Sequence, residues 1–215
     1  MKRDIINFND NYWLTNDVLA GIKTMTRRLV PDIVPAIKEL RILDGYCQAR
    51  YGETWFPHKG PQYKVGNVVA IAQSYHTLGY DEQWVIHNIS PNPNETVEEN
   101  PCFDKLYPAY KNKLFVRAQF MAHHIRITDV KVERLQDISD ADCIKEGIFV
   151  DDFNSDMGFP DTYGFKKRTK DRMFYHVQEF KTPKIAFENL ISSMMGKATW
   201  DKNPWVFVYT FNLID

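Results

Sequence analysis

Hydrophobic residues recur along the chain with two different spacings, and these predict both helices and strands. In residues 183–195 the apolar positions follow the i, i+3, i+4, i+7 rule of a helix with one buried stripe. Residues 205–213 alternate instead, which places every second side chain on the same face of a strand. Strands are also predicted for residues 22–29, 67–75 and 120–134. The chain therefore mixes helical and extended segments.

Helix-capping residues locate further helices. A short helix is predicted over residues 15–21, where polar residues open the segment and a glycine ends it. Another is predicted over residues 139–147, because Ser139 is followed three residues later by an aspartate, as in a capping box. The apolar spacing of residues 37–42 also indicates a short helix. Residues 52–64, rich in glycine, proline and aromatic residues, are predicted to form a loop.

Two long polar segments interrupt this pattern, over residues 76–118 and 148–181. They lack clean periodicity, and the first contains several prolines, so we predict them to be insertions. At 215 residues the chain has room for one domain with such excursions but little room for two. Strands mixed with short helices indicate either an α+β arrangement or a partly closed barrel. Periodicity alone leaves both open.

Composition limits the classes of partner. The formal net charge is −1, whereas a protein that holds a long nucleic-acid backbone usually has a basic surplus. Small ligands or a short RNA contact fit this charge better. The three cysteines lie far apart and form neither a disulfide framework nor a zinc pattern. Because His123 and His124 are adjacent, they would face opposite sides of a strand, so no metal and no cofactor are predicted.

The N-terminal residues run into polar sequence rather than into the apolar core of a signal peptide. No apolar run approaches the roughly 20 residues that a membrane helix needs. We therefore expect a cytoplasmic protein without a membrane partner. The sequence predicts no oligomeric state.

Four segments, in this order, resemble the ASCH family, whose members share a PUA-like barrel. The family signature Gly-x-Lys-x-x-Glu-x-Arg corresponds here to residues 21–28, Gly-Ile-Lys-Thr-Met-Thr-Arg-Arg. A threonine replaces the glutamate, as in the bacterial ASCH enzymes that hydrolyse N(4)-acetylcytidine. The turn and strand at residues 63–71 match a second family segment. Residues 132–147 and 200–211 are similar to forms seen in prophage-encoded relatives.

The resemblance implies a single PUA-like (ASCH) domain over residues 1–215: a partly closed β-barrel with flanking short helices and the two insertions bordering its cleft. It also implies binding of RNA, a nucleotide or a modified nucleoside in that cleft, with hydrolysis of an acylated cytidine as one outcome. The catalytic residues it implies are Lys23, Thr26 and Glu146. The substrate-binding residues it implies are Gly21, Thr24, Arg27 and Arg28.

The chemistry of a threonine and a lysine indicates a nucleophile and a base, respectively. A threonine hydroxyl needs a neighbouring base before it can attack. Lys23 can be that base only when neutral, so its pKa must fall from about 10.4 toward 7, at a cost of roughly 4 kcal/mol. A dry site next to Arg27 and Arg28 would lower it in this way. On a straight strand, however, Lys23 and Thr26 face opposite sides. The plain alternative is a surface lysine and a threonine at the rim of the sheet.

For the other candidate residues, too, a purely structural role is an alternative to a functional one. Glu146 could orient Lys23 or carry protons to the leaving amine, or it could be a solvated glutamate at a helix end. Arg28 could bind phosphate or a carbonyl through its forked donors, or form a salt bridge. The basic run 166–172, flanked by aromatic residues, could contact an RNA backbone, although a solvated loop is the more common structure.

Three functions remain open from the sequence. The first is an amidohydrolase that acts on an acylated nucleoside through Lys23, Thr26 and Glu146. The second is a non-catalytic module that binds RNA or a modified base in the same cleft. The third is a phage accessory protein that binds a host protein. A hydroxyl placed beside a lysine favours the enzyme, because a module that only binds has no need of one.

Overall fold

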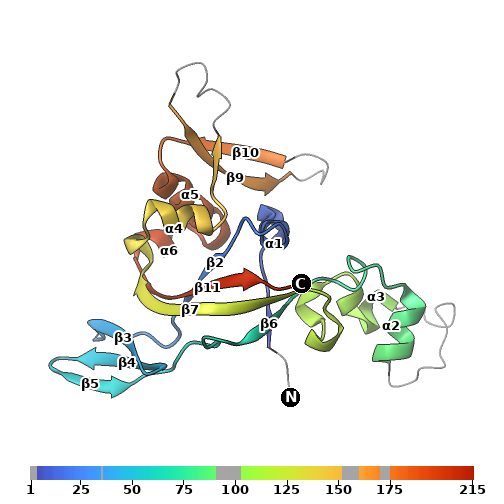
Figure 1. The fold of residues 1–215 in the computed structure, drawn as a ribbon, viewed down its shortest axis with the longest axis horizontal. Helices are drawn as coiled ribbons and strands as arrows, with labels where there is room; N and C mark the ends of the chain where they lie inside the picture. The colour runs from blue at the N-terminus through green and yellow to red at the C-terminus, as the bar shows by residue number, and fades with distance from the viewer. Residues whose placement is uncertain (1–3, 35, 91–102, 152–159, 170–174) are drawn as a thin grey trace. The chain divides into compact units, whose positions relative to one another are not determined.

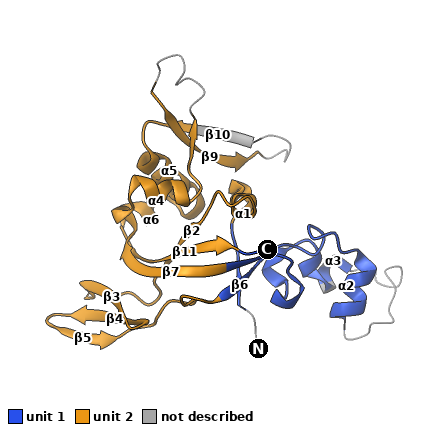
Figure 2. Cartoon of the chain, in the orientation of Figure 1, with its two compact units in different colours: residues 1–8, 68–125, 214–215 blue, residues 9–67, 126–213 orange. Residues whose placement is uncertain are grey.

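The computed structural model describes residues 4–34, 36–90, 103–151, 160–169 and 175–215, which form a mixed α+β fold, as the sequence predicts (Figure 1). The described chain divides into two compact units (Figure 2). The first comprises residues 1–8, 68–125 and 214–215, and the second comprises residues 9–67 and 126–213. The assignment of residues 1–215 to one domain stays a prediction.

The first unit contains a short parallel strand pair and several short helices. Strand β1 (Ile5–Ile6) pairs with β6 (Val68–Ile71), with Ile5 opposite Ala70. The predicted insertion at residues 76–118 belongs to this unit. The described residues from 76 to 120 form α2 (Glu82–Ile89), α3 (Phe103–Leu106) and 3₁₀ turns at Pro108–Tyr110, Lys113–Phe115 and Ala118–Phe120. Helix α2 begins at Asp81, whose carboxylate accepts a hydrogen bond from the main-chain N–H of Trp84 at 2.6 Å.

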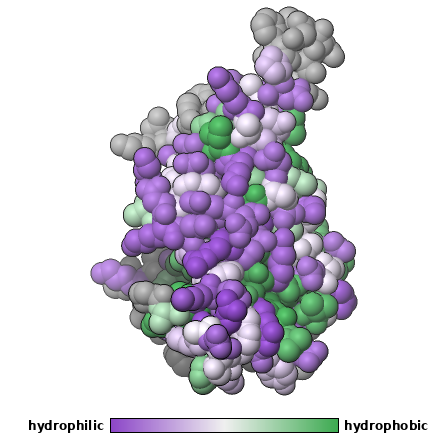
Figure 3. All heavy atoms as spheres, turned by 90° about the vertical axis from the view of Figure 1, so that its left-hand side faces the viewer, coloured by the Kyte–Doolittle hydropathy of each residue, from purple (hydrophilic) through white to green (hydrophobic). Residues whose placement is uncertain are grey.

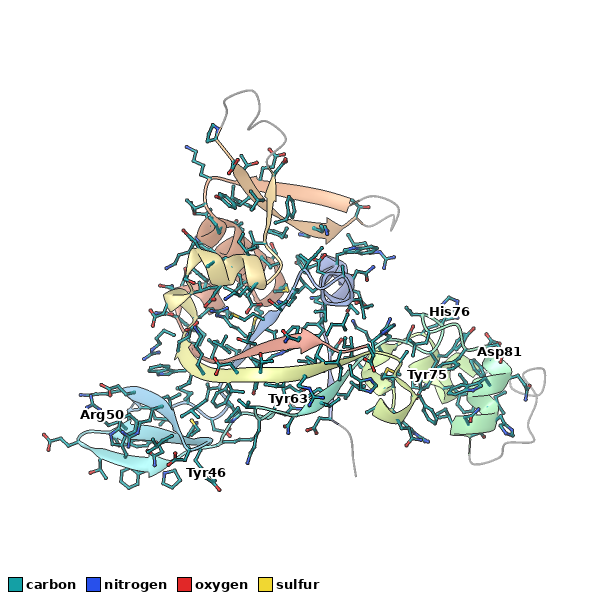
Figure 4. The ribbon with its side chains drawn as sticks, viewed as in Figure 1. Tyr46, Arg50, Tyr63, Tyr75, His76 and Asp81 are labelled. Carbon is teal, nitrogen blue, oxygen red and sulfur yellow. The ribbon has the colours of Figure 1, made fainter. Side chains whose placement is uncertain are left out.

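Aromatic side chains fill the core of this unit. The Tyr75 ring is fully buried and meets Trp84 and Phe120 edge to face, at centroid distances of 5.7 and 6.1 Å. Tyr80 stacks on Trp84 at 3.8 Å. Aromatic rings bury large areas in preferred edge or stacked geometries, so this segment has a packed interior of its own. Figure 4 labels Tyr75 and the neighbouring His76 and Asp81 at the start of this region.

In the second unit, three of the predicted strands lie side by side in the order β7-β11-β2. Strand β2 (Met25–Leu29) pairs antiparallel with β11 (Trp205–Leu213), and Thr26 lies opposite Tyr209. Strand β7 (His124–Arg134) begins in the first unit and continues through the second. The main-chain N–H of Ile127 in this strand donates to the carbonyl of Asn67 at 2.9 Å. The residues just before β6 therefore lie alongside β7 and are hydrogen-bonded to it.

The predicted partly closed PUA-like barrel is not confirmed. In the described part of the chain the strands form open sheets, and β2 is an outer strand with β11 as its neighbour. A barrel requires the first and last strands of a sheet to pair with each other. The coarser prediction, a mixed α+β protein with short helices beside the sheet, agrees with the structure.

Residues 39–57 form a three-stranded antiparallel sheet, which replaces the predicted helix at 37–42 and the first part of the loop predicted at 52–64; residues 58–64 contain no strand or helix. Its strands are β3 (Glu39–Leu43), β4 (Tyr46–Tyr51) and β5 (Thr54–Pro57). Asp44 and Gly45 join the first two with φ values of 51° and 77°, the positive pair of a type I′ hairpin turn. That turn directs β4 back along β3, so pairing between strands overrides the weak helical spacing.

Helices and a second small sheet complete this unit. Helix α1 (Leu14–Leu19) lies near the predicted residues 15–21, and α5 (Pro183–Met195) has the predicted bounds. Helix α5 packs against α4 (Asp140–Lys145) and α6 (Lys197–Asp201). The described part of the predicted insertion 148–181 forms the sheet β8 (Phe149–Asp151), β9 (Thr162–Arg168) and β10 (Tyr175–Phe180), which the sequence did not predict.

Candidate functional site

A tight turn delivers Lys23 from the end of α1 to the start of β2. Gly21 has a φ of 71°, a left-handed conformation that glycine adopts without strain. The main-chain N–H groups of Ile22 and Lys23 both donate to the carbonyl of Asp17, at 2.8 and 2.9 Å. These bonds fix the backbone just before the strand. The Lys23 side chain is consequently buried, with 2% of its surface exposed.

Glu146 holds the buried ammonium of Lys23. Lys23 Nζ donates to Glu146 Oε2 at 2.6 Å and to the Glu146 main-chain oxygen at 2.7 Å. Glu146 ends α4 and precedes Gly147, whose φ of 101° favours glycine. A Cβ at position 147 would lie 3.8 Å from Lys23 Cβ, so the two backbones approach closely. The helix end and the start of β2 thus bring two of the predicted catalytic residues together.

Arg27 connects three carboxylates beside this pair. Its Nη1 donates to Glu146 Oε1 at 2.9 Å, so Arg27 and Lys23 bind different oxygens of one carboxylate. Its Nη2 donates to Glu133 at 2.6 Å and to Asp142 at 3.4 Å. The Arg27 side chain is 2% exposed, and its guanidinium lies 5.8 Å from the Phe187 ring centroid. A planar fork of donors suits such a shared site better than an ammonium would.

A further lysine closes the network on its more exposed side. Lys131 Nζ lies 2.9 Å from Glu133 Oε2 and 3.2 Å from Asp142 Oδ2. Burial would raise the pKa of Asp142, but the hydrogen bond and charge of Lys131, with Arg27 and Lys145, hold it below its usual value. The same carboxylates raise the pKa of Lys131 against the effect of burial. The Asp142 carboxylate is therefore held in its charged form.

Lys23 shows the opposite balance. Burial lowers the pKa of Lys23 and is the largest effect, because the charged ammonium loses its hydration. The charge and hydrogen bond of Glu146 oppose this shift, whereas the positive charges of Arg28 and Arg27 add to it. The direction is the one that a lysine base requires. A neutral amine is easier to reach here than on an exposed lysine.

Thr26 does not share this contact. It is buried on β2 between Met25 and Arg27, and alternation along the strand turns it to the face opposite Arg27. Within the described residues, both hydrogen bonds of Lys23 Nζ go to Glu146, and none joins it to the Thr26 hydroxyl. Lys23 itself precedes β2, so the contact with Glu146 is made before the strand begins, whereas Thr26 lies within the strand.

The predicted binding residues are distributed differently. Arg27 is buried in the ion network, whereas Gly21 and Arg28 are exposed and Thr24 is half-buried. The main-chain N–H of Thr24 donates to the main-chain carbonyl of Lys145 at 2.9 Å, which connects the residues before β2 to the last turn of α4. Of this predicted set, Arg27 contacts the Lys23–Glu146 pair directly.

Sequence reasoning missed Glu133 and Lys131 as members of the network and assigned Asp142 only a capping position. One signal was present: Lys131 and Glu133 are two residues apart on a predicted strand, so both side chains point to the same face. Ser139 caps α4 as predicted, accepting a hydrogen bond from the Asp142 main-chain N–H at 3.2 Å. That cap places the Asp142 side chain in the first turn of the helix.

The basic run 166–172 lies only partly in the described chain, since residues 170–174 are outside it. Lys166 Nζ binds Asp17 at 2.9 Å, and Phe165 is buried. Phe165 is therefore part of the core and is not free to stack a base. Asp17 also supports Lys23 through its carbonyl, so this part of the insertion 148–181 lies near the Lys23 segment. The predicted place of the insertion 76–118 beside the same site stays a prediction.

Two remaining observations concern other ligands. His123 Nδ1 and His124 Nδ1 both lie near Asp215, at 3.2 Å from its carbonyl and 3.0 Å from Oδ2 respectively. The described residues contain no group of three histidine, cysteine or acidic side chains arranged to hold a metal ion. Every helix in the same described ranges is too short or too polar to span a membrane.

Comparison of the chain with protein-family models, curated proteins and solved structures gives no match. The case for a function therefore rests on the residues themselves. Its centre is a buried lysine and a carboxylate in direct contact, flanked by a buried arginine.

Proposed function

We propose that this protein binds a nucleoside, nucleotide or short RNA next to the Lys23–Glu146 pair and hydrolyses the exocyclic amide of an acylated cytidine. The observation that carries the proposal is the 2.6 Å contact between Lys23 Nζ and Glu146 Oε2 in a buried setting. It joins two of the three residues to which the ASCH resemblance gives a catalytic role. Burial and the nearby arginines lower the Lys23 pKa, which favours a base.

The proposed chemistry begins with the proton shared by the pair. Glu146 accepts a proton from the Lys23 ammonium, and the neutral amine then removes a proton from the attacking hydroxyl group. Oxygen bonds to the acyl carbon, and the carbon–nitrogen bond breaks as Lys23 returns the proton to the departing amine. The products of attack by water are the free carboxylic acid and cytidine. A main-chain N–H group, or Arg28, which is exposed on the outer strand β2, would donate to the developing oxyanion.

The geometry favours water over Thr26 as the attacking group. Thr26 lies on the face of β2 opposite Arg27, which shares Glu146 with Lys23, and the two hydrogen bonds of Lys23 Nζ in the described residues go to Glu146. A nucleophile must lie within hydrogen-bond reach of its base, about 2.6–3.2 Å or somewhat longer without ligand. The threonine route would therefore need the start of β2 to rearrange when substrate binds.

A non-catalytic binding module is the second candidate. Lys23 Nζ already has two oxygen partners, and only 2% of the side chain is exposed. Such a lysine is well suited to stabilising the fold around a binding surface built from neighbouring exposed and half-buried residues. In this case Gly21, Thr24 and Arg28 would contact the ligand, and Lys23 would position them.

The test is hydrolysis of N(4)-acetylcytidine by the purified protein, followed by chromatography of cytidine. We expect turnover by the wild type and a loss of about 10²-fold or more in both Lys23→Met and Glu146→Gln, because members of a catalytic unit act together. Thr26→Val, which keeps the shape but removes the hydroxyl, should retain activity if water attacks. Lys131→Met is the matched control, since it removes a lysine–carboxylate contact without touching Lys23 or Glu146.

Circular dichroism and calorimetric binding of N(4)-acetylcytidine accompany each assay. Binding without turnover by the wild type would favour the binding module over the enzyme. Activity lost in Thr26→Val with the fold intact would restore the threonine as nucleophile. If the folded wild type neither binds nor hydrolyses the nucleoside, the proposed function is wrong.

A further inference from the structure

One face of the sheet β3–β4–β5 carries aromatic and basic side chains. In the antiparallel register, Glu39 lies opposite Arg50, and Arg50 lies opposite Trp55. Residues two apart on each strand share this face, which adds Arg41 on β3 and Tyr46 on β4. Figure 4 labels Tyr46 and Arg50 on this sheet. The face thus combines two aromatic rings with two guanidinium groups.

The opposite face anchors the sheet. Leu40, Cys47 and Ala49, which alternate with the residues named above, are all buried. A sheet with one buried face needs no further apolar contact on its other side. The aromatic rings of the outer face are therefore not explained by packing of the core.

The first stacking group is Trp55, whose ring carries the guanidinium of Arg41 on one side. The guanidinium carbon of Arg41 lies 4.0 Å from the Trp55 ring centroid, and that of Arg50 lies 6.0 Å from it. Arg41 Nε also donates to Gln48 Oε1 at 2.8 Å, which fixes the guanidinium over the ring. Arg50 in turn forms an ion pair with Glu39. A flat base can stack on the outer plane of an oriented guanidinium as well as on an aromatic ring.

The second aromatic group is Tyr46, which is 70% exposed directly after the Asp44–Gly45 turn. Lys64 Nζ lies 5.7 Å from its ring centroid. Tyr46 and Arg50 are four residues apart on one strand, which corresponds to about 13 Å along the sheet. Two stacking groups at this separation suit an extended ligand of several nucleotides.

Charge favours the same class of ligand. Residues 38–64 contain five lysines and arginines against three acidic residues, a net charge of +2, whereas the whole chain has −1. The remaining residues therefore sum to −3, so the positive charge is concentrated in the segment that carries the exposed rings.

Figure 3, which views the molecule from the left-hand side of Figure 1, shows hydrophobic residues exposed low on that side, at the height of β3, β4 and β5.

We infer that the Arg41–Trp55–Tyr46 face binds single-stranded nucleic acid by base stacking and phosphate contacts. Stacking of bases on aromatic rings beside arginine and lysine is the usual basis of single-strand binding without strong sequence preference. Paired bases in a duplex do not expose their faces to such rings. The inference is independent of the function proposed for Lys23, because it rests on a different set of residues.

The experiment is fluorescence anisotropy with labelled oligouridine and oligothymidine of about 12 nucleotides, and with a duplex of the same length. At about 50 mM salt we expect both single strands to bind more tightly than the duplex. Trp55→Ala and Tyr46→Ala should each weaken single-strand binding by about fivefold to a hundredfold. Arg41→Gln should reduce the salt dependence, by about 0.7 in the slope of log affinity against log salt.

Phe115→Ala is the matched control, because Phe115 is also an exposed aromatic residue, at 58%, but belongs to the first unit. It should leave the affinity unchanged. Tyr46→Ala is the decisive variant, since so exposed a side chain can be removed with little effect on folding. The ratio of RNA to DNA affinity identifies which polymer is preferred, and preference for either supports the inference.

Three results would overturn this inference. They are failure of the wild type to bind any single strand at low salt, equal affinity for the duplex, and unchanged affinity in both folded aromatic variants. Hydrolysis of N(4)-acetylcytidine, if the protein has that activity, should persist in Trp55→Ala. A failure of either proposal can therefore be recognised without the other.

Discussion

Lys23 donates both to the carboxylate and to the main-chain carbonyl of Glu146, at 2.6 and 2.7 Å. Two oxygens of one residue therefore hold an ammonium that is almost entirely removed from water. Desolvation of two charges offsets much of their attraction, so an intact buried pair adds little net stability. Loss of either partner is costly, because the other charge stays buried with fewer partners: Lys23 would keep a main-chain oxygen, and Glu146 would keep Arg27. This asymmetry allows the role of the pair in folding to be separated from its role in chemistry.

The first prediction is a double-mutant cycle on this pair. Lys23→Met and Glu146→Gln should each lower the free energy of unfolding by about 3–5 kcal/mol, measured by urea denaturation. The double variant should lose less than the sum of the two, because neither buried charge then remains alone. Lys131→Met serves as the control, since Lys131 is 43% exposed and its loss should cost about 0–1 kcal/mol. Strictly additive losses would show that the two residues are not coupled.

The second prediction concerns the arginine fork. Arg27→Lys keeps the positive charge but cannot bind Glu133, Asp142 and Glu146 together. We expect thermal unfolding to show a loss of about 2–5 kcal/mol, most of it from carboxylates left without a donor. The neighbouring Arg28→Lys changes an exposed residue and should stay within about 0.5 kcal/mol of the wild type. Similar losses in both variants would contradict the special position of Arg27.

The third prediction is a pH dependence of stability. The pKa of Asp142 is lower in the folded protein than in the unfolded chain, so the native state binds fewer protons there. This contribution is present above the unfolded value of about 3.9 and is lost as the pH falls through the lower folded value. The midpoint of urea unfolding, followed from pH 7 to about 3, should therefore fall on the acid side. Asp142→Asn should flatten that part of the profile, and an unchanged slope would contradict the assignment.

The fourth prediction tests how α4 is positioned. The Ser139 hydroxyl accepts a hydrogen bond from the Asp142 main-chain N–H, so Ser139→Ala should cost about 1 kcal/mol. Ser139→Asn keeps an acceptor at the cap and should recover most of that loss. Both variants are compared by chemical denaturation. Since Glu146 directly follows α4 as its C-cap, an effect on hydrolysis larger than that on stability would show that Ser139 also sets the Lys23 contact.

The fifth prediction concerns Cys143, which is fully buried on α4. Burial raises the pKa of its thiol to about 12, so at pH 8 only about one thiol in 10⁴ is ionised. We expect iodoacetamide to leave Cys143 unmodified in the native protein and to label it after unfolding in urea. Peptide mass mapping distinguishes this cysteine from Cys47. Rapid native labelling of Cys143 would show that α4 opens more readily than its packing indicates.

Local sequence determined the elements that depend on neighbouring residues. The stripe of α5 and its proline start gave the observed bounds, Pro183–Met195, and the alternation at residues 205–213 gave β11. Ser139 marked the start of α4 for the same reason, since a cap is formed within one turn. The sheet β3–β4–β5 was missed because its short apolar run fits both a helix and a strand. Pairing across the Asp44–Gly45 turn decided between them.

For the candidate site, the sequence indicated which residues belong to it but not which of them are in contact. The sequence identified Lys23, Thr26 and Glu146 by resemblance, and the period of a strand already indicated that Lys23 and Thr26 would face apart. It could not show that residues 23 and 146 meet, because that contact depends on where the end of α4 lies against the start of β2. It also could not show that Arg27 shares Glu146 with Lys23. Burial and charge partners are properties of the packed chain, so only the tertiary structure decided which of these groups stand together and how their pKa values shift.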